Sequence, residues 1–155
     1  MPADPKPIRP PKEKPRFLKR KTKKVRKNRV KRVKLPSFKS LKARAWSLFS
    51  EFIRKRDSIN GMVACCSCSK LIPYKESQAG HFIPGRMFSV LFHERLTHGQ
   101  CAPCNIWKHG NLYQYGKFML ARYGKEEVEK MEQEAKKVVK FTRSDLEAII
   151  AKYST

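Results

Sequence analysis

The sequence predicts an α+β fold: a small treble-clef core around a zinc ion, flanked by α-helices and preceded by a basic arm. Two Cys-x-x-Cys pairs, Cys65 with Cys68 and Cys101 with Cys104, have the spacing at which tight turns deliver thiolates to zinc. Met62-Val63-Ala64, a short run typical of a strand, leads into the first pair, and a helix is indicated after the second. A zinc knuckle, a β-hairpin and a helix that starts at the second pair together describe a treble clef.

The length of 155 residues allows one domain of ordinary size with an extension. We expect a basic arm over residues 1–36 and a zinc-stabilised domain over residues 37–155. Seven of the ten prolines lie in the first 36 residues, and 18 of the 36 lysines and arginines lie in the first 42. Because such a segment cannot bury a core, we expect the arm to be flexible without DNA.

The formal net charge of +23 indicates a polyanionic partner, and nucleic acid is the first candidate. The basic side chains of the arm that we expect to contact DNA phosphates are Arg16, Lys19, Arg20, Lys21, Lys23, Lys24, Arg26, Lys27, Arg29, Lys31, Arg32 and Lys34. A solubilising tail or, in a eukaryotic host, a nuclear address is the alternative interpretation of the arm. The sequence contains no apolar stretch typical of a signal peptide or a transmembrane helix, so we expect a cytoplasmic protein without a membrane partner.

Apolar residues at helical spacing predict helices on both sides of the cysteine pairs. The expected helices are 38–56 after the N-cap Ser37, a segment from about 112 to 122 closed by Gly124, 126–139, and a last helix whose capping box is Ser144 with Glu147. The dipeptide Asn60-Gly61 predicts a turn before the first strand.

The cysteines favour a metal over disulfides, because five is an odd count in a chain without an export signal. Four thiolates leave zinc no open position for a substrate, so we expect the ion to be structural. The fifth cysteine is Cys66. Cys65 has the better spacing to Cys68, so we expect Cys66 to be a free or packed thiol.

Any chemistry must then come from the segment between the pairs and from the helix that follows. His81 lies in this segment and Asn105 follows the second pair, so folding of the clef would bring an imidazole and an amide oxygen together. Phosphodiester hydrolysis needs a base to activate water and a cation to stabilise the phosphate. His81 could supply the base and Asn105 one oxygen ligand for Mg²⁺. The alternative is that His81 is a buried, hydrogen-bonded histidine.

These residues carry a resemblance. The cysteine pairs, Gly80-His81, Asn105 and Lys108 resemble the zinc-containing branch of the HNH (ββα-metal) nucleases, which includes the endonuclease VII type of junction-resolving enzyme. With its basic arm and the segments 79–82 and 98–101, nearly the whole chain resembles the NinG (Rap) recombination endonucleases of lambdoid bacteriophages. The resemblance implies an endodeoxyribonuclease, dependent on Mg²⁺ or Mn²⁺, that cuts branched DNA such as Holliday junctions and D-loops. It also implies that His81 is the general base, that Asn105 ligates the catalytic metal, and that Lys108 is a basic residue one turn later.

Two positions depart from the pattern of these nucleases. Gly80 stands where relatives often have an acidic residue or a second histidine, and Leu96 stands at the position of the middle Asn. One metal ligand is therefore unassigned. The candidates near the gap are His93, Glu94, His98 and His109, of which His98 is preferred because it is close to the second cysteine pair.

The sequence therefore supports a structure-selective DNA endonuclease, with branched DNA as its partner. The alternative is a zinc-dependent nucleic-acid-binding module without catalysis, and a structural RNA-binding role rests on the arm alone. Because four-way junctions are two-fold symmetric, we expect a homodimer, with host or phage recombination proteins as further partners. One aromatic residue, Trp107 or Tyr113, could stack on an unpaired base, and the alternative is that these residues belong to the core.

Overall fold

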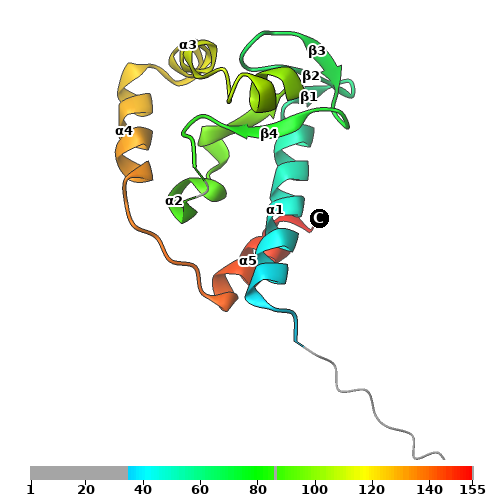
Figure 1. Ribbon diagram of the computed structural model, residues 1–155, viewed down its shortest axis with the longest axis vertical. Helices are drawn as coiled ribbons and strands as arrows, with labels where there is room; N and C mark the ends of the chain where they lie inside the picture. Colours follow the sequence, from blue (N-terminus) through cyan, green and yellow to red (C-terminus); the bar gives the residue numbers. More distant parts are fainter. Residues whose placement is uncertain (1–34, 86, 155) are drawn as a thin grey trace, which may run out of the picture. The chain divides into compact units, whose positions relative to one another are not determined.

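The computed structural model describes residues 35–85 and 87–154 (Figure 1). The predicted arm lies outside the described residues, apart from Leu35 and Pro36. All of its expected DNA contacts, from Arg16 to Lys34, also lie outside them. The described part combines helices with two small sheets, which confirms the α+β class.

Helix α1 (Phe38–Arg56) has the bounds that the periodicity predicts. Ser37 caps it, because the side chain of Ser37 accepts a hydrogen bond from the Ser40 amide. The apolar stripe of α1 is buried at Leu41, Ala45, Phe49 and Ile53. This stripe packs against Leu146, Ile150 and Tyr153 of α5 (Arg143–Tyr153), so the first and last helices lie side by side (Figure 1).

The first sheet is antiparallel and contains β1 (Ser58–Ile59), β2 (Met62–Ala64) and β3 (Leu71–Pro73) in that order. The predicted turn between β1 and β2 is present. Asn60 and Gly61 both have positive φ, 51° and 77°, as the tight turns of β-hairpins require. The turn between β2 and β3 carries the first cysteine pair.

The second sheet pairs β4 (Gln78–His81) with β5 (Thr97–Gln100). The strands are antiparallel, and His81 lies opposite Thr97. They are joined through α2 (Phe88–Leu91) and η1, a short 3₁₀ turn (Glu94–Leu96).

Two polar residues at the end of α1 hold β5 in place. The Arg56 guanidinium donates to the carbonyl oxygens of Glu94 and Thr97, at 2.8 and 2.9 Å. The Asp57 carboxylate accepts from the Gly99 amide at 2.8 Å. The end of helix α1 is thus hydrogen-bonded both to η1, at Glu94, and to β5, at Thr97 and Gly99.

The second cysteine pair leads into η2, a single π-helical turn (Pro103–Trp107), rather than into a long helix. The helix predicted after it is present as α3 (Leu112–Tyr123), which ends at Gly124 as expected. A π-helical turn places its side chains differently from a regular helix and occurs often at functional sites.

Two predictions about the C-terminal helices are wrong in detail. Helix α4 (Lys125–Ala135) ends four residues before the predicted end. The segment 136–140 is Lys-Lys-Val-Val-Lys, which has no apolar stripe at helical spacing, and Val138 is exposed. The capping box of α5 consists of Thr142 and Asp145, two residues before the predicted pair, because the Asp145 carboxylate accepts from both the amide and the hydroxyl of Thr142.

None of the helices in the described part of the chain is both long and apolar enough to cross a membrane.

Candidate functional site

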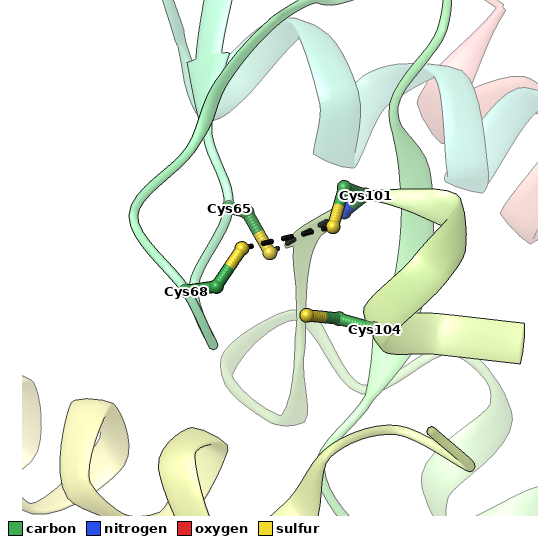
Figure 2. A group of neighbouring side chains, drawn as sticks. All are labelled: Cys65, Cys68, Cys101 and Cys104. Atoms are coloured by element: carbon green, nitrogen blue, oxygen red, sulfur yellow. Dashed lines mark hydrogen bonds between the residues drawn. The ribbon is translucent and has the colours of Figure 1, made fainter. Parts of the chain in front are cut away.

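The four predicted zinc ligands converge in the described structure. Cys65 and Cys68 come from the turn between β2 and β3, whereas Cys101 follows β5 and Cys104 lies in η2. Figure 2 shows the four side chains pointing toward one another. We call this group the four-cysteine centre; its Sγ atoms all lie within 4.8 Å of one another.

The sulfur positions fit a metal ion. Zn–S bonds of about 2.3 Å in a tetrahedron place neighbouring sulfurs roughly 3.8 Å apart, and the Sγ atoms of Cys68 and Cys101 are 3.8 Å apart. The Cys101 amide lies 3.4 Å from Cys65 Sγ and the Asn111 side-chain amide 3.5 Å from Cys104 Sγ, and each donates to that sulfur. Donors of this kind stabilise thiolates. The centre could therefore hold a metal ion such as zinc.

Cys66 does not belong to this centre. Its side chain is buried in a different cluster, with Val90, Leu96, Tyr115 and Met119 among its members. Burial raises the pKa of the Cys66 thiol, since the thiolate would lose its hydration there. Cys66 is thus a packed thiol, which is one of the two states that its position predicts.

A pocket of about 540 Å³ opens beside the four-cysteine centre. We call it the His81 pocket. The polar and aromatic side chains in its lining are Trp46, Ser50, Arg54, Ser77, Gln78, His81, Asn105 and His109. The described lining contains an arginine and two histidines but no carboxylate, so an anionic phosphate would meet no like charge there.

His81 lies at the end of β4, and the neighbours that hold it include Leu91 and Trp46. Its Nε2 lies 3.2 Å from the Leu91 carbonyl oxygen, and the imidazole stacks on the Trp46 ring with a centroid separation of 5.1 Å. A carbonyl oxygen can only accept, so Nε2 carries the proton in the neutral ring and Nδ1 is the basic nitrogen.

Asn105 lines the same pocket from η2. Its side-chain nitrogen donates to Gln78 Oε1 at 2.7 Å, which joins η2 to β4 and fixes the amide. The structure therefore brings His81 and Asn105 into one pocket, as the order of residues along the chain predicts.

His98 does not line the pocket. It is buried between two tyrosines, with Nδ1 3.0 Å from the Tyr115 hydroxyl and Nε2 2.9 Å from the Tyr123 hydroxyl. Because Tyr115 donates its proton to the Gly80 carbonyl oxygen at 2.9 Å, it must accept from Nδ1 of His98, and Nε2 accepts from Tyr123. Burial lowers the pKa of His98 to about 3. This hydrogen-bond chain fixes the backbone of β4 directly before His81.

The remaining candidate site residues from the sequence differ in whether they line the His81 pocket. Lys108 ends η2 and is exposed, but it does not line the pocket. His93 accepts a hydrogen bond from the Leu96 amide, and the Glu94 carboxylate is bonded to Lys152 and Tyr153. Of the four residues proposed for the unassigned ligand, His109 is the one in the described pocket lining.

The two departures from the nuclease pattern have structural causes. Leu96 is fully buried in the core, where an asparagine would lose apolar contacts. Gly80 lies so close to Gln100 that a Cβ atom at position 80 would overlap the side-chain oxygen Oε1 of Gln100. Glycine is therefore the residue that fits there.

Sequence reasoning missed, among other lining residues, the two that contact His81 and Asn105, namely Trp46 and Gln78. Trp46 lies within the predicted helix 38–56 but was not singled out, because its contact with His81 depends on the packing of α1 against β4, for which a single sequence carries no signal. Gln78 was not singled out either, because its bond to Asn105 spans 27 residues.

A family model described as "Bacteriophage Lambda NinG protein" matches residues 7–155. "Protein ninG" of Escherichia phage lambda is 35% identical over 103 residues, which are 66% of this chain and 48% of the relative. The proteins of the same name from Escherichia phage 933W and Salmonella phage P22 are 36% and 35% identical over 103 residues, which are 66% of this chain and 49% and 48% of those relatives. The chain spans about half the length of these curated relatives, and no solved structure matches it.

Proposed function

The chain belongs to the NinG family of bacteriophage proteins, and on that premise we propose that it is a structure-selective DNA endonuclease. Its substrates would be branched recombination intermediates, such as Holliday junctions and D-loops, and its reaction the metal-assisted hydrolysis of a phosphodiester bond. The observation that carries the proposal is the convergence of His81 and Asn105 in one pocket without a described carboxylate.

His81 is the proposed general base. The Leu91 carbonyl oxygen holds the proton on Nε2, which leaves Nδ1 as the nitrogen that takes a proton from water. Stacking on Trp46 fixes the plane of the imidazole, so the ring does not have to be oriented at the moment of reaction. The water, once deprotonated, attacks phosphorus, the bond between phosphorus and the leaving oxygen breaks, and that oxygen takes a proton from solvent to become the hydroxyl end of one strand.

Asn105 is the proposed ligand for a divalent cation, Mg²⁺ or Mn²⁺. When bound, this cation would stabilise the negative charge that develops on the phosphate. An amide oxygen suits hard cations of this kind. The absence of a carboxylate from the described lining means that the phosphate itself must supply much of the negative charge that binds the cation.

The four-cysteine centre is proposed to be a structural zinc site within a treble-clef, HNH-like core. Four thiolates saturate a tetrahedral ion and leave no position for a substrate. The centre joins the β2–β3 turn to the start of η2, and Asn105 directly follows its last ligand. Zinc would thus place the metal ligand of the pocket.

His98 and Lys108 take roles outside the pocket in this proposal. His98 is a positioning residue, since it acts on β4 through Tyr115 and does not face the lining of the pocket. Lys108 is exposed three residues after Asn105, where it can contact a DNA phosphate next to the one that is cut.

The basic arm is proposed to bind DNA phosphates without reading the base sequence. Selection for branch points then has to come from the shape of the DNA, and a homodimer would match the two-fold symmetry of a junction. The host cytoplasm is the proposed location.

The substrate range tests this proposal. Purified full-length chain is incubated with a four-way junction, a three-strand junction and a linear duplex, with Mg²⁺ and then with EDTA. We expect Mg²⁺-dependent cutting of the branched substrates at least tenfold faster than cutting of the duplex. Equal cutting of all three would contradict branch selectivity, and tight binding without any cutting would favour the non-catalytic binding module.

A further inference from the structure

Among the buried side-chain nitrogen and oxygen atoms of the described residues, Oε1 of Gln100 is the one that lacks a hydrogen-bond partner. Gln100 is 0% exposed. A buried polar atom without a hydrogen bond destabilises a fold, so its presence needs a reason.

The orientation of the Gln100 side-chain amide follows from the hydrogen bonds of its nitrogen, Nε2. Gln100 Nε2 donates to the Gly110 carbonyl oxygen at 2.5 Å and to the Ser67 hydroxyl at 2.6 Å. Since the Gly110 carbonyl can only accept, the nitrogen of the Gln100 amide must lie on that side. Its oxygen therefore faces the opposite direction, toward β4.

Gln100 Oε1 occupies the space that a side chain on Gly80 would otherwise take. A Cβ atom at position 80 would overlap Gln100 Oε1 and would lie 3.1 Å from Asn105 Oδ1. Two amide oxygens thus lie beside the same point, one from β5 and one from η2. Neither oxygen carries a proton, and such a pair of dipoles attracts a cation.

We propose that Gln100 Oε1 is a second oxygen ligand, with Asn105 Oδ1, for the divalent cation, and that it replaces the side chain missing at Gly80. This inference rests on the proposed function and assigns the ligand that the sequence pattern leaves open. Asn105 lines the His81 pocket and Gln100 is fully buried behind it, so the proposed site would open to solvent on the side of Asn105. Two neutral ligands leave the charge of the cation uncompensated, so it binds more tightly when DNA phosphate is present.

Mn²⁺ binding to the zinc-loaded full chain is the readout, measured by electron paramagnetic resonance of free Mn²⁺ with an uncut four-way junction in the His81→Ala background. Gln100→Met keeps the length of the side chain and removes the oxygen, and we expect at least tenfold weaker Mn²⁺ binding. The matched control is Ser67→Ala, which removes a partner of the amide nitrogen and keeps the oxygen. It should change the affinity less than twofold.

A second pair of variants separates ligation from packing. In Gln100→Ala, Mn²⁺ binding should be lost. Adding Gly80→Asp to this variant places a carboxylate in the vacated space and should restore binding to within about threefold of the original chain or better. A purely structural role for Gln100 predicts no rescue.

A third test uses nuclear magnetic resonance of the unsubstituted chain, so its result does not depend on whether a variant folds. Addition of Mg²⁺ should shift the ¹³C resonance of the Gln100 side-chain carbonyl carbon, and the resonance of Gln133, which lies on α4, should stay constant. An unchanged Gln100 resonance at saturating Mg²⁺ with junction DNA overturns the proposal.

The outcomes distinguish this inference from the proposed function. Junction cutting together with Mn²⁺ binding that is insensitive to Gln100 would retain the nuclease and overturn the ligand. Mn²⁺ binding that depends on Gln100, without cutting of any substrate by the unsubstituted chain, would retain the cation site and contradict the nuclease.

Discussion

The four-cysteine centre and the His81 pocket meet where Cys104 is followed by Asn105, and they differ in their donor atoms and in their exposure to solvent. The centre has four sulfur donors, three of them in buried residues, that already lie within 4.8 Å of one another. The pocket is open, is lined by amide, hydroxyl and imidazole groups, and is shared by residues from α1, β4 and η2. Clustered thiolates fit a tightly held ion such as zinc. The amide oxygens beside the pocket fit the cation of the proposed function, which would bind together with its substrate.

The order of the chain links the two sites. Gln100, Cys101, Cys104 and Asn105 lie within six positions, so the two proposed cation ligands directly flank two of the proposed zinc ligands. Loss of the proposed zinc ion should therefore also disturb the pocket, whereas a change in the pocket should leave the four-cysteine centre intact. This asymmetry can be tested by experiment.

Removal of the zinc ligands should have the largest effect. Structural zinc contributes about 10–16 kcal/mol in small domains, which is comparable to the whole stability of a domain. Cys104→Ala should abolish zinc binding and the cooperative unfolding transition, measured by elemental analysis and circular dichroism. Cys66→Ala is the matched control, with full zinc content and a cost of about 1–2 kcal/mol from lost packing. Zinc retention by Cys104→Ala would contradict the assignment of the centre.

Acid should weaken the fold through His98. The pKa of this buried histidine is lowered to about 3 from an ordinary value of 6.5. The unfolded chain therefore binds a proton below pH 6.5 that the folded chain excludes. The free energy of unfolding should decrease as the pH falls from 6.5 toward 3, by up to about 1.4 kcal/mol per pH unit for this group. In His98→Gln the decrease between pH 6.5 and 5.5 should be shallower, as urea titrations can measure. Parallel curves for the two proteins would exclude His98 as the source.

Trp107 should have the smallest effect, and only on DNA binding. Its side chain is 78% exposed on η2, so its loss should change the stability by less than about 0.5 kcal/mol. Stacking on an unpaired base is worth about 1–3 kcal/mol, so Trp107→Ala should weaken junction binding roughly fivefold or more and leave duplex binding unchanged. Ile59→Ala, at an equally exposed side chain on β1, is the control for fluorescence-anisotropy titrations. Equal losses on junction and duplex would exclude stacking.

The sequence predicted those parts of the molecule whose geometry is local. The Cys-x-x-Cys turns bring their two sulfurs together within four residues, and the apolar stripe of α1 requires only helical periodicity. The turn at Asn60 and Gly61 follows from their tolerance of positive φ. These elements have the expected bounds because no distant contact is needed to specify them.

The interior of the site could not be predicted in this way. All four residues of β5 are buried, so the strand shows no alternation that would reveal which side His98 or Gln100 faces. The contact of Gln100 with Gly80 depends on the pairing of β4 with β5, across 20 positions of sequence. For the same reason His98 was expected near the chemistry, although the fold places it between two tyrosines.

The proposal that His81 is the general base, and that the four-cysteine centre has only a structural role, is tested most directly by the variant His81→Ala on a four-way junction. Loss of a general base typically reduces the rate 10²- to 10⁴-fold, so single-turnover cutting with Mg²⁺ should slow by at least about a hundredfold. Junction affinity and zinc content should stay unchanged. His93→Ala, a histidine that caps η1 outside the pocket, is the matched control and should cut at nearly the rate of the unsubstituted protein. Cutting by His81→Ala at the unsubstituted rate, in protein free of contaminating nuclease, would contradict the central claim.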